Sequence, residues 1–279
     1  MSSPAEKVPI GVFDSGVGGL SVLRHIHTLL PDESLLYAAD SLYAPYGNKS
    51  ADFIRDRAFW LSEFLLARGA KALVVACNTA TAAAVSAMRQ RYDLPIIGME
   101  PAVKPAAAAS RSGVVGVLAT SGTLKSAQFA ALLESYGQHV QVVTQACHGL
   151  VECIERGELN AGSTKLLLQG YLRPLLDAGA DTIVLGCTHY PFVRDLIETS
   201  IEEFAASGSI KKDVAKEMVL IDTGAAVARH LKHRLEETDL RTDTANAGDV
   251  GFWSNSPSAG AQQVISQLWG EAVEVAALD

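Results

Sequence analysis

The sequence has little of what marks a membrane, secreted or nucleic-acid-binding protein. No stretch of its 279 residues is long and apolar enough to span a bilayer, and residues 1–7 are polar and lack the apolar region of a signal peptide. Basic residues are few, with 23 Lys and Arg against 31 Asp and Glu, so the net charge is −8. That balance argues against broad binding to nucleic acid or to an anionic membrane. We therefore expect a soluble, cytoplasmic protein.

Cysteine is also scarce, and its spacing does not indicate a metal site. No close Cys-x-x-Cys pair is present, so a structural zinc site is not expected, and we expect no bound metal. In a cytosolic chain of this size the thiols are expected to be reduced. The four cysteines are Cys77, Cys147, Cys153 and Cys187.

Apolar runs and helix-like runs alternate along almost the whole chain, which predicts an α/β fold. The apolar runs show little polar alternation, as is typical of strands buried on both faces. The succession of strand, helix and strand implies parallel sheets with right-handed crossovers. The expected strands are 8–13, 34–38, 72–75, 95–97, 114–118, 141–144, 182–185 and 219–221. The expected helices are 20–30, 51–68, 81–92, 125–136, 164–178, 192–204 and 225–235.

Two breaks in this pattern predict two domains. Two prolines interrupt the segment 98–105, and the stretch 206–216 is polar. We predict a discontinuous first domain, residues 1–98 plus 213–279, with a second domain, residues 99–212, inserted in it. Each predicted domain contains a strand that is followed by a cysteine, a threonine and a helix.

Two of the cysteines stand where a predicted strand ends. Cys77 follows the apolar run 72–75, and Cys187 follows the run 182–185. In open α/β sheets this edge is where ligands bind, and a thiol at a helix N-terminus can take or give a proton near neutral pH. One such thiol from each half of the chain suggests two acid/base groups that face one substrate from opposite sides.

Simpler roles are open to the same residues. A lone cysteine beside an apolar strand is usually a small buried hydrophobe, and we favour that role for Cys147 and Cys153. His189 can be a surface residue at a helix start, although its position two residues after Cys187 favours the polarisation of that thiol. Asp14 can be a turn former, an active-site residue or both.

The Gly-rich turn DSGVGG at residues 14–19 does not support nucleotide binding. Its spacing is not Gly-x-Gly-x-x-Gly, and no Gly-Lys-Ser/Thr follows. Glycines let the backbone approach a ligand, and a helix N-terminus offers amides to an anion. The turn is therefore either a tight connection between a strand and a helix or a site for a small anionic group such as a carboxylate.

Six segments together resemble the glutamate racemases of bacterial cell-wall synthesis. They occur in the family's order and spacing over nearly the whole chain, and in combination they are highly specific. The segments are VFDSGVGGLSV at 12–22, Asp40 with APYG at 44–47, VACNTAT at 75–81, GVLAT at 116–120, GCTHYPF at 186–192 and IDTG at 221–224. The resemblance implies two pseudo-symmetric α/β domains, each a mostly parallel sheet flanked by helices, with the active site in the cleft between them.

The resemblance implies a cofactor-independent interconversion of L- and D-glutamate that supplies D-glutamate for peptidoglycan synthesis. Inversion needs removal of the α-proton from one face and delivery to the other, which two thiols can perform when one is ionised and the other is not. By resemblance, Cys77 acts on D-glutamate with the help of Asp14, and Cys187 acts on L-glutamate with the help of His189. The residues implied to hold the substrate are Asp14, Ser15, Tyr46, Gly47, Asn78, Thr79, Thr188 and His189.

One segment departs from the family's pattern. The family has Cys-Pro followed a few residues later by Val-Glu, whereas this chain reads CHGLVECIE at residues 147–155. By spacing, Glu155 matches the family's glutamate and takes its supporting electrostatic role. Glu152 stands where the family usually has proline, and it can be a surface residue.

Other functions and partners stay open at this point. Related aspartate racemases tend to carry glutamate where this chain has His189, which favours glutamate as the substrate. A non-catalytic amino-acid-binding protein on the same scaffold would not need both thiols. The resemblance also implies a homodimer. Some family members restrain DNA gyrase, but nothing in this acidic chain supports gyrase or nucleic acid as a partner.

Overall fold

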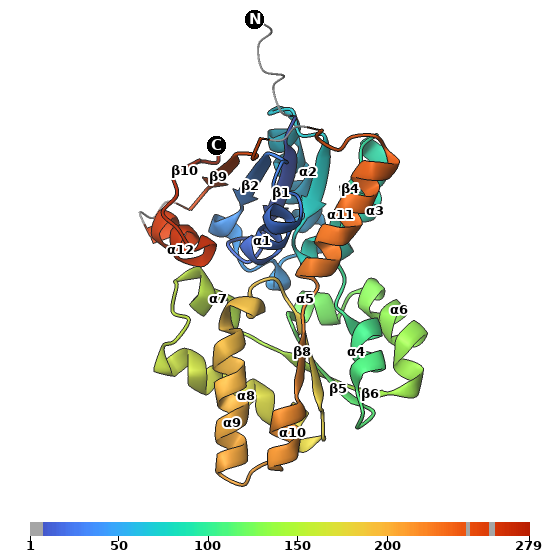
Figure 1. The fold of residues 1–279 in the computed structure, drawn as a ribbon, viewed down its shortest axis with the longest axis vertical. Helices are drawn as coiled ribbons and strands as arrows, with labels where there is room; N and C mark the ends of the chain where they lie inside the picture. Colours follow the sequence, from blue (N-terminus) through green and yellow to red (C-terminus); the bar gives the residue numbers. More distant parts are fainter. Residues whose placement is uncertain (1–7, 244–245, 257–259) are drawn as a thin grey trace, which may run out of the picture. The chain divides into compact units, whose positions relative to one another are not determined.

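The computed structural model describes residues 8–243, 246–256 and 260–279, and the chain divides into two compact units. The first unit comprises Met1–Met99 and Gly224–Asp279, and the second comprises Glu100–Thr223. Each unit is built on its own parallel sheet with helices on it (Figure 1). The predicted α/β class, with parallel sheets flanked by helices, is confirmed.

The first unit contains a six-stranded sheet in the order β10-β9-β2-β1-β3-β4. Every neighbouring pair in it is parallel. Its strands are β1 (Ile10–Asp14), β2 (Leu35–Ala39), β3 (Ala72–Val75), β4 (Ile96–Ile97), β9 (Val250–Ser254) and β10 (Val275–Ala277). Every residue of β1 and β3 is buried, which explains why neither strand shows polar alternation in the sequence.

The helices of the first unit form two groups. Helix α1 packs against α11 and α12, whereas α2 packs against α3. Their bounds are Leu20–Leu29 for α1, Ala51–Leu66 for α2, Asn78–Arg91 for α3, Gly224–Glu237 for α11 and Gly260–Trp269 for α12. Two short 3₁₀ turns, η1 (Ser41–Tyr43) and η2 (Tyr46–Asn48), connect β2 to α2.

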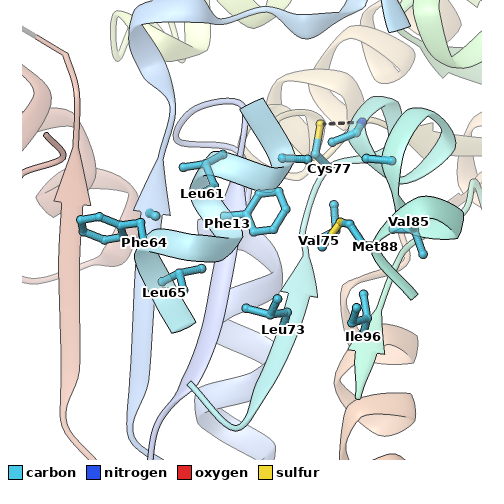
Figure 2. Packing of buried hydrophobic residues seen from close by; sticks show 14 of the residues in the cluster. Phe13, Leu61, Phe64, Leu65, Leu73, Val75, Cys77, Val85, Met88 and Ile96 are labelled. Carbon is cyan, nitrogen blue, oxygen red and sulfur yellow. Dashed lines mark hydrogen bonds between the residues drawn. The ribbon is translucent and has the colours of Figure 1, made fainter. Parts of the chain in front are cut away.

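The apolar core between α2, α3 and the sheet fixes the position of β3. Figure 2 shows Leu61 and Leu65 of α2 beside Phe13 and Leu73 of the sheet, and all four side chains are fully buried. Burying a large apolar side chain contributes roughly 1.5–3 kcal/mol, so this cluster is a main source of the unit's stability. Because Cys77 belongs to the same cluster, the core also holds the start of α3 in place.

The second unit contains a four-stranded parallel sheet in the order β6-β5-β7-β8. Helix α4 packs against α6, and α9 packs against α8 and α10. The strands are β5 (Val114–Ala119), β6 (Gln141–Ala146), β7 (Thr182–Gly186) and β8 (Val219–Ile221). The helices are α4 (Val103–Ala109), α5 (Ser121–Leu124), α6 (Ala127–Tyr136), α7 (Leu150–Glu155), α8 (Gly162–Asp177), α9 (Arg194–Ala206) and α10 (Lys212–Glu217), with 3₁₀ turns η3 (Gly137–His139) and η4 (Tyr190–Val193).

The domain boundary predicted between residues 212 and 213 is wrong. Strand β8 pairs with β7 in the second sheet, with Thr182 beside Val219, so residues 213–223 belong to the second unit. A strand of three residues carries too short a pattern to reveal which sheet it joins. The first predicted boundary, after residue 98, lies one residue before the observed boundary after Met99.

The two sheets share one internal order. In each unit the first strand lies between the second and third, and the fourth lies beyond the third. Strand β3 of the first unit therefore corresponds to β7 of the second, and each is followed by a cysteine. In the part of the chain described, no helix is long and apolar enough to cross a membrane.

Candidate active site

Cys77 lies just beyond the carboxyl end of β3 and caps helix α3. Its Sγ accepts a hydrogen bond from the Ala80 amide at 3.4 Å, drawn as a dashed line in Figure 2. The side chain is 5% exposed. An amide that donates to sulfur at a helix N-terminus stabilises the thiolate form of a cysteine. The local structure thus suits a thiol that gives and takes a proton.

Asp14 and Ser15 reach this thiol from the neighbouring strand. Cys77 Sγ lies 3.7 Å from Ser15 Oγ, and Ser15 Oγ donates to Asp14 Oδ1 at 3.3 Å. Strands β1 and β3 are paired in parallel, with Phe13 beside Val75, so their carboxyl ends meet. Asp14 is fully buried. A buried carboxylate is therefore linked to the Cys77 thiol through one hydroxyl.

The Gly-rich turn packs closely around Asp14. The Gly19 amide donates to Asp14 Oδ2 at 2.7 Å, so the carboxylate that this amide holds is the chain's own. A Cβ on Gly19 would lie 2.8 Å from Asp14 Cβ and 2.9 Å from the Tyr37 hydroxyl, which leaves no room for a larger residue. The tight connection, one of the two roles that the sequence left open, accounts for Gly19.

Asn78 is a buried polar side chain at the start of α3. It is 4% exposed, and neither its Nδ2 nor its Oδ1 has a hydrogen-bond partner among the described residues. Leaving a buried polar group unpaired costs about 1–3 kcal/mol, so such a group at a strand end indicates a ligand site. Thr79, the next residue, is also buried. This position suits the substrate-binding role expected for both residues.

Tyr46 lies in η2 with its hydroxyl already engaged. The residue is 1% exposed, and its hydroxyl donates to the buried carboxylate of Asp40. Burial, the charge of Asp40 and the nearby Cys77 thiol raise the pKa of Tyr46 well above its ordinary value, so the hydroxyl stays protonated. Its proton is directed to Asp40, which leaves the backbone of Tyr46 and Gly47 as the donors implied by the resemblance.

Cys187 lies at the carboxyl end of β7 in a different local setting. Its backbone oxygen accepts from the Tyr190 amide at 3.1 Å, and the 3₁₀ turn η4 separates it from α9. The helix predicted at 192–204 is α9, which begins at Arg194, so no α-helix starts directly at this cysteine. The thiol depends on His189 instead, because Cys187 Sγ lies 3.7 Å from His189 Nδ1. Thr188 Oγ1 lies 3.5 Å from the same nitrogen.

Glu155, which is partly buried, completes a chain of three side chains with the buried Cys187 and His189 in the second unit. Its Oε1 lies 2.6 Å from His189 Nε2, and the two side chains are 14% and 1% exposed. Burial alone would lower the pKa of His189, but hydrogen bonds to Cys187 and Glu155 outweigh it and raise that pKa well above its ordinary value of 6.5. The imidazole is therefore held protonated beside the thiol. This contact agrees with the choice of Glu155 over Glu152 by spacing, while the catalytic role stays a prediction.

The raised pKa of His189 predicts a pH-dependent stability. Its charged form pairs with Glu155, so this stabilisation is complete below about pH 6.5, the unfolded-state pKa, and is lost as the pH rises through the folded-state pKa. Glu155→Gln is expected to lower the free energy of unfolding by about 3 kcal/mol near pH 6 and by less above the folded-state pKa. Urea unfolding at several pH values measures this. Glu152→Gln, on the same helix, is the control, and an equal loss at every pH would contradict the assignment.

A substitution at Asp14 tests its link to Cys77. Asp14→Asn keeps the shape of the side chain but removes its charge, and is expected to reduce turnover by about 10–100-fold. Because the equilibrium constant of a racemisation is one, kcat/KM must fall equally in both directions. Any difference between the two directions of the reaction must then appear in kcat and KM separately. Both constants are measured by polarimetry, starting from each enantiomer. Unchanged kcat in both directions would remove Asp14 from the mechanism.

The remaining cysteines fit the simpler role predicted for them. All four cysteines are free and buried. Burial raises the pKa of Cys147 to about 12, so its thiol stays neutral near pH 7. Among the described residues no group of three His, Cys, Asp or Glu side chains could hold a metal ion.

Three polar residues near this site have connections that the sequence did not reveal. Asp40 accepts hydrogen bonds from Arg57, Tyr46 and Asn255. Asp40 belongs to one of the segments that carry the family resemblance, which is a signal for its importance. Arg57 and Asn255 lie 17 and 215 positions from Asp40, and no local pattern connects them.

Comparison with known proteins agrees with this arrangement. A model of the Asp/Glu/Hydantoin racemase family matches residues 10–231. The glutamate racemase of Ectopseudomonas mendocina (strain ymp) is 57% identical over 270 residues, which cover 96% of this chain and 97% of that protein. The glutamate racemase of Pseudomonas putida (strain W619) is 55% identical and covers 96% of both chains.

Solved structures show the same likeness. A glutamate racemase isoform from Bacillus anthracis has a TM-score of 0.83 at 29% identity, over 97% of each chain. Escherichia coli glutamate racemase, in complex with L-glutamate and the activator UDP-MurNAc-ala, has a TM-score of 0.81 at 33% identity, over 96% of this chain and 97% of that one. The chain therefore belongs to the Asp/Glu/hydantoin racemase family. Within that family, the relatives just named are all glutamate racemases.

Proposed function

We propose that this chain is a cofactor-independent glutamate racemase that works through Cys77 and Cys187. The observation that carries the proposal is the equivalent placement of the two thiols. Each follows the third strand of its own sheet, and each lies within 3.7 Å of a side chain that links it to a buried or nearly buried carboxylate. The named relatives, which match nearly the whole chain, support glutamate as the substrate.

The proposed reaction is a proton exchange across the α-carbon. With L-glutamate, the Cys187 thiolate removes the α-proton while the Cys77 thiol delivers its own proton to the opposite face, and with D-glutamate the two cysteines exchange roles. At the start of either direction, this reaction requires one thiol to be ionised and the other to be protonated. No proton is gained or lost overall, and the step uses only side chains of this chain.

Neighbouring groups would assist proton transfer at each cysteine. The protonated His189, held by Glu155, places a positive charge beside Cys187, which stabilises its thiolate. For Cys77 the Ala80 amide has this role, and Ser15 with Asp14 provides a path for its proton. The two thiols are thus assisted by different neighbouring groups.

The substrate's charged groups require several donors. We propose that the unpartnered amide of Asn78 binds the substrate together with Ser15, Thr79 and the backbone of Tyr46 and Gly47 on the first unit. Thr188 has the same role on the second. We further propose that the enzyme acts in the cytoplasm as a homodimer and supplies D-glutamate for peptidoglycan.

Proton NMR in D2O tests the activity directly. Purified protein is incubated with D-glutamate and a reducing agent, without pyridoxal phosphate, while optical rotation is followed in parallel. We expect the α-proton signal to disappear as the rotation decays to zero. Exchange with aspartate but not with glutamate would keep the chemistry and change the substrate. Silence with both amino acids, from a folded sample, would contradict the proposal.

A further inference from the structure

A buried charged cluster lies behind the Cys77 site and has no part in the proton transfer described above. At its centre is Asp40, which directly follows β2 and is fully buried. Its Oδ1 accepts from Arg57 Nη2 at 2.7 Å and from Asn255 Nδ2 at 2.5 Å. Its Oδ2 accepts from Arg57 Nε at 2.9 Å and from the Tyr46 hydroxyl. Four donor contacts from three residues therefore converge on one carboxylate.

The cluster ties together segments that are far apart in the sequence. Arg57 comes from α2, and its guanidinium lies over the rings of Tyr43 and Trp60, at 4.6 and 4.3 Å from their centroids. Asn255 follows β9, and its Oδ1 accepts from the Leu42 amide at 2.9 Å. Apart from the Arg57–Trp60 contact, which lies within α2, these connections lead to the loop between β2 and α2. That loop carries Tyr46 and Gly47.

The cluster also reaches the catalytic thiol through Tyr46. The Tyr46 side chain packs in the same buried apolar cluster as Cys77. Its hydroxyl donates a hydrogen bond to Asp40, so the side chain is held both by apolar packing of the ring and by its polar end. A movement of Asp40 would therefore move the loop segment beside Cys77.

Stability alone is a poor explanation for this arrangement. A buried ion pair gains little over a well-packed apolar alternative, because both charges must leave water. What a pair with four hydrogen bonds does provide is a fixed geometry, since the planar guanidinium binds the carboxylate in two places at once. Such a fixed geometry would hold the adjacent loop in one position, as the binding of a small charged substrate requires.

We propose that Asp40, paired with Arg57, is a positioning residue for the racemase reaction, which fixes the Tyr46–Gly47 segment for substrate binding beside Cys77. The proposal rests on the proposed function of the chain. Asp40 itself touches neither the substrate nor the reacting atoms. Its effect passes through the Tyr46 hydroxyl and the backbone of the loop.

Asp40→Asn tests the proposal, because it keeps the size of the side chain but removes the charge that Arg57 and Tyr46 bind. We expect KM for glutamate to rise by about tenfold or more while kcat changes less, since displacement of a binding segment weakens substrate positioning. Tyr46→Phe removes only the hydroxyl and is expected to shift KM in the same direction by a smaller factor. It also serves as the second variant if Asp40→Asn does not fold.

The chain offers a matched control at the opposite end of the same strand. Glu33 precedes β2, is 1% exposed, and pairs with Lys71 at 2.6 Å. Glu33→Gln breaks a buried ion pair of the same kind in the same unit, but far along the strand from the loop of Tyr46. Thermal unfolding of both variants shows whether their losses of stability are comparable. A merely structural role predicts equal kinetic effects, whereas positioning predicts an effect for Asp40→Asn alone.

A second readout does not depend on glutamate. Iodoacetamide alkylation of Cys77, located by peptide mass spectrometry, is expected to be about threefold faster or more in Asp40→Asn and unchanged in Glu33→Gln, because a loosened Tyr46 uncovers the thiol. If the wild type does not racemise glutamate, the proposed function fails, and this rate still tests the position of Tyr46. Unchanged KM and unchanged alkylation in Asp40→Asn, or the same changes in Glu33→Gln, would overturn the proposal.

Discussion

Replacement of Cys77 by serine is expected to reduce glutamate racemisation by about 10³-fold or more in both directions. A serine hydroxyl is a far weaker acid than a thiol, so it can neither supply a base nor deliver a proton at a useful rate near neutral pH. In the proposed mechanism each direction needs both groups, and because the equilibrium constant is one, kcat/KM must fall equally from L- and D-glutamate. Polarimetry from each pure enantiomer measures the loss.

The fold of the Cys77→Ser variant should be unchanged. Serine is close to cysteine in size, and the Ala80 amide that donates to the sulfur can donate to a hydroxyl instead. Cys147→Ser is the matched control, because that thiol is also buried and is neutral near pH 7. We expect the control to keep wild-type turnover. Full turnover in Cys77→Ser, or a comparable loss in Cys147→Ser, would contradict the assignment of the first thiol.

Replacement of Cys187 by serine is expected to reduce glutamate racemisation by about the same factor. It is also expected to confine residual α-proton exchange to one enantiomer. Its partner His189 loses the thiol it contacts but keeps Glu155, so the second unit should stay folded. In the proposed mechanism the remaining Cys77 acts on D-glutamate only. Any residual exchange of the α-proton with D2O is therefore expected from D-glutamate and not from L-glutamate.

The mirror-image result is expected in the Cys77→Ser variant, where residual exchange is confined to L-glutamate. Proton NMR of each variant with each enantiomer gives four measurements, and the proposal fixes their pattern in advance. Equal residual exchange from both enantiomers in either variant would show that the two cysteines do not divide the faces of the substrate between them.

The part of the fold that the sequence predicts well is the part whose pattern is local. Strands β1, β3 and β7 are buried along their whole length, so each appears as a short apolar run with a candidate site residue at or just after its end. This is why the sequence alone places Asp14, Cys77 and Cys187 at sheet edges. Each of these predictions depends on a short run of neighbouring residues.

The parts that sequence patterns do not reveal depend on contacts between distant segments. The sequence pattern does not predict strands β9 and β10, because β9 is recognisable mainly by its pairing with β2, far earlier in the chain. The pattern does predict strand β8 as an element but places it in the wrong domain, because its pairing with β7 is not visible in the sequence. The donors to Asp40 and the contact between Glu155 and His189 likewise join residues that no periodicity relates.

The origin of hydrogen in the first molecules of product tests the two-thiol mechanism most directly. Wild-type protein is mixed with undeuterated L-glutamate in D2O and stopped at a few per cent conversion, and each enantiomer is separated and analysed by mass spectrometry. The mechanism predicts D-glutamate that carries deuterium at the α-carbon, beside L-glutamate that keeps its original hydrogen. The delivering thiol carries solvent deuterium, and the abstracting thiol acts only on the other face. Early product that retains the substrate's hydrogen, or deuterium in both enantiomers alike, would contradict it and indicate a single base.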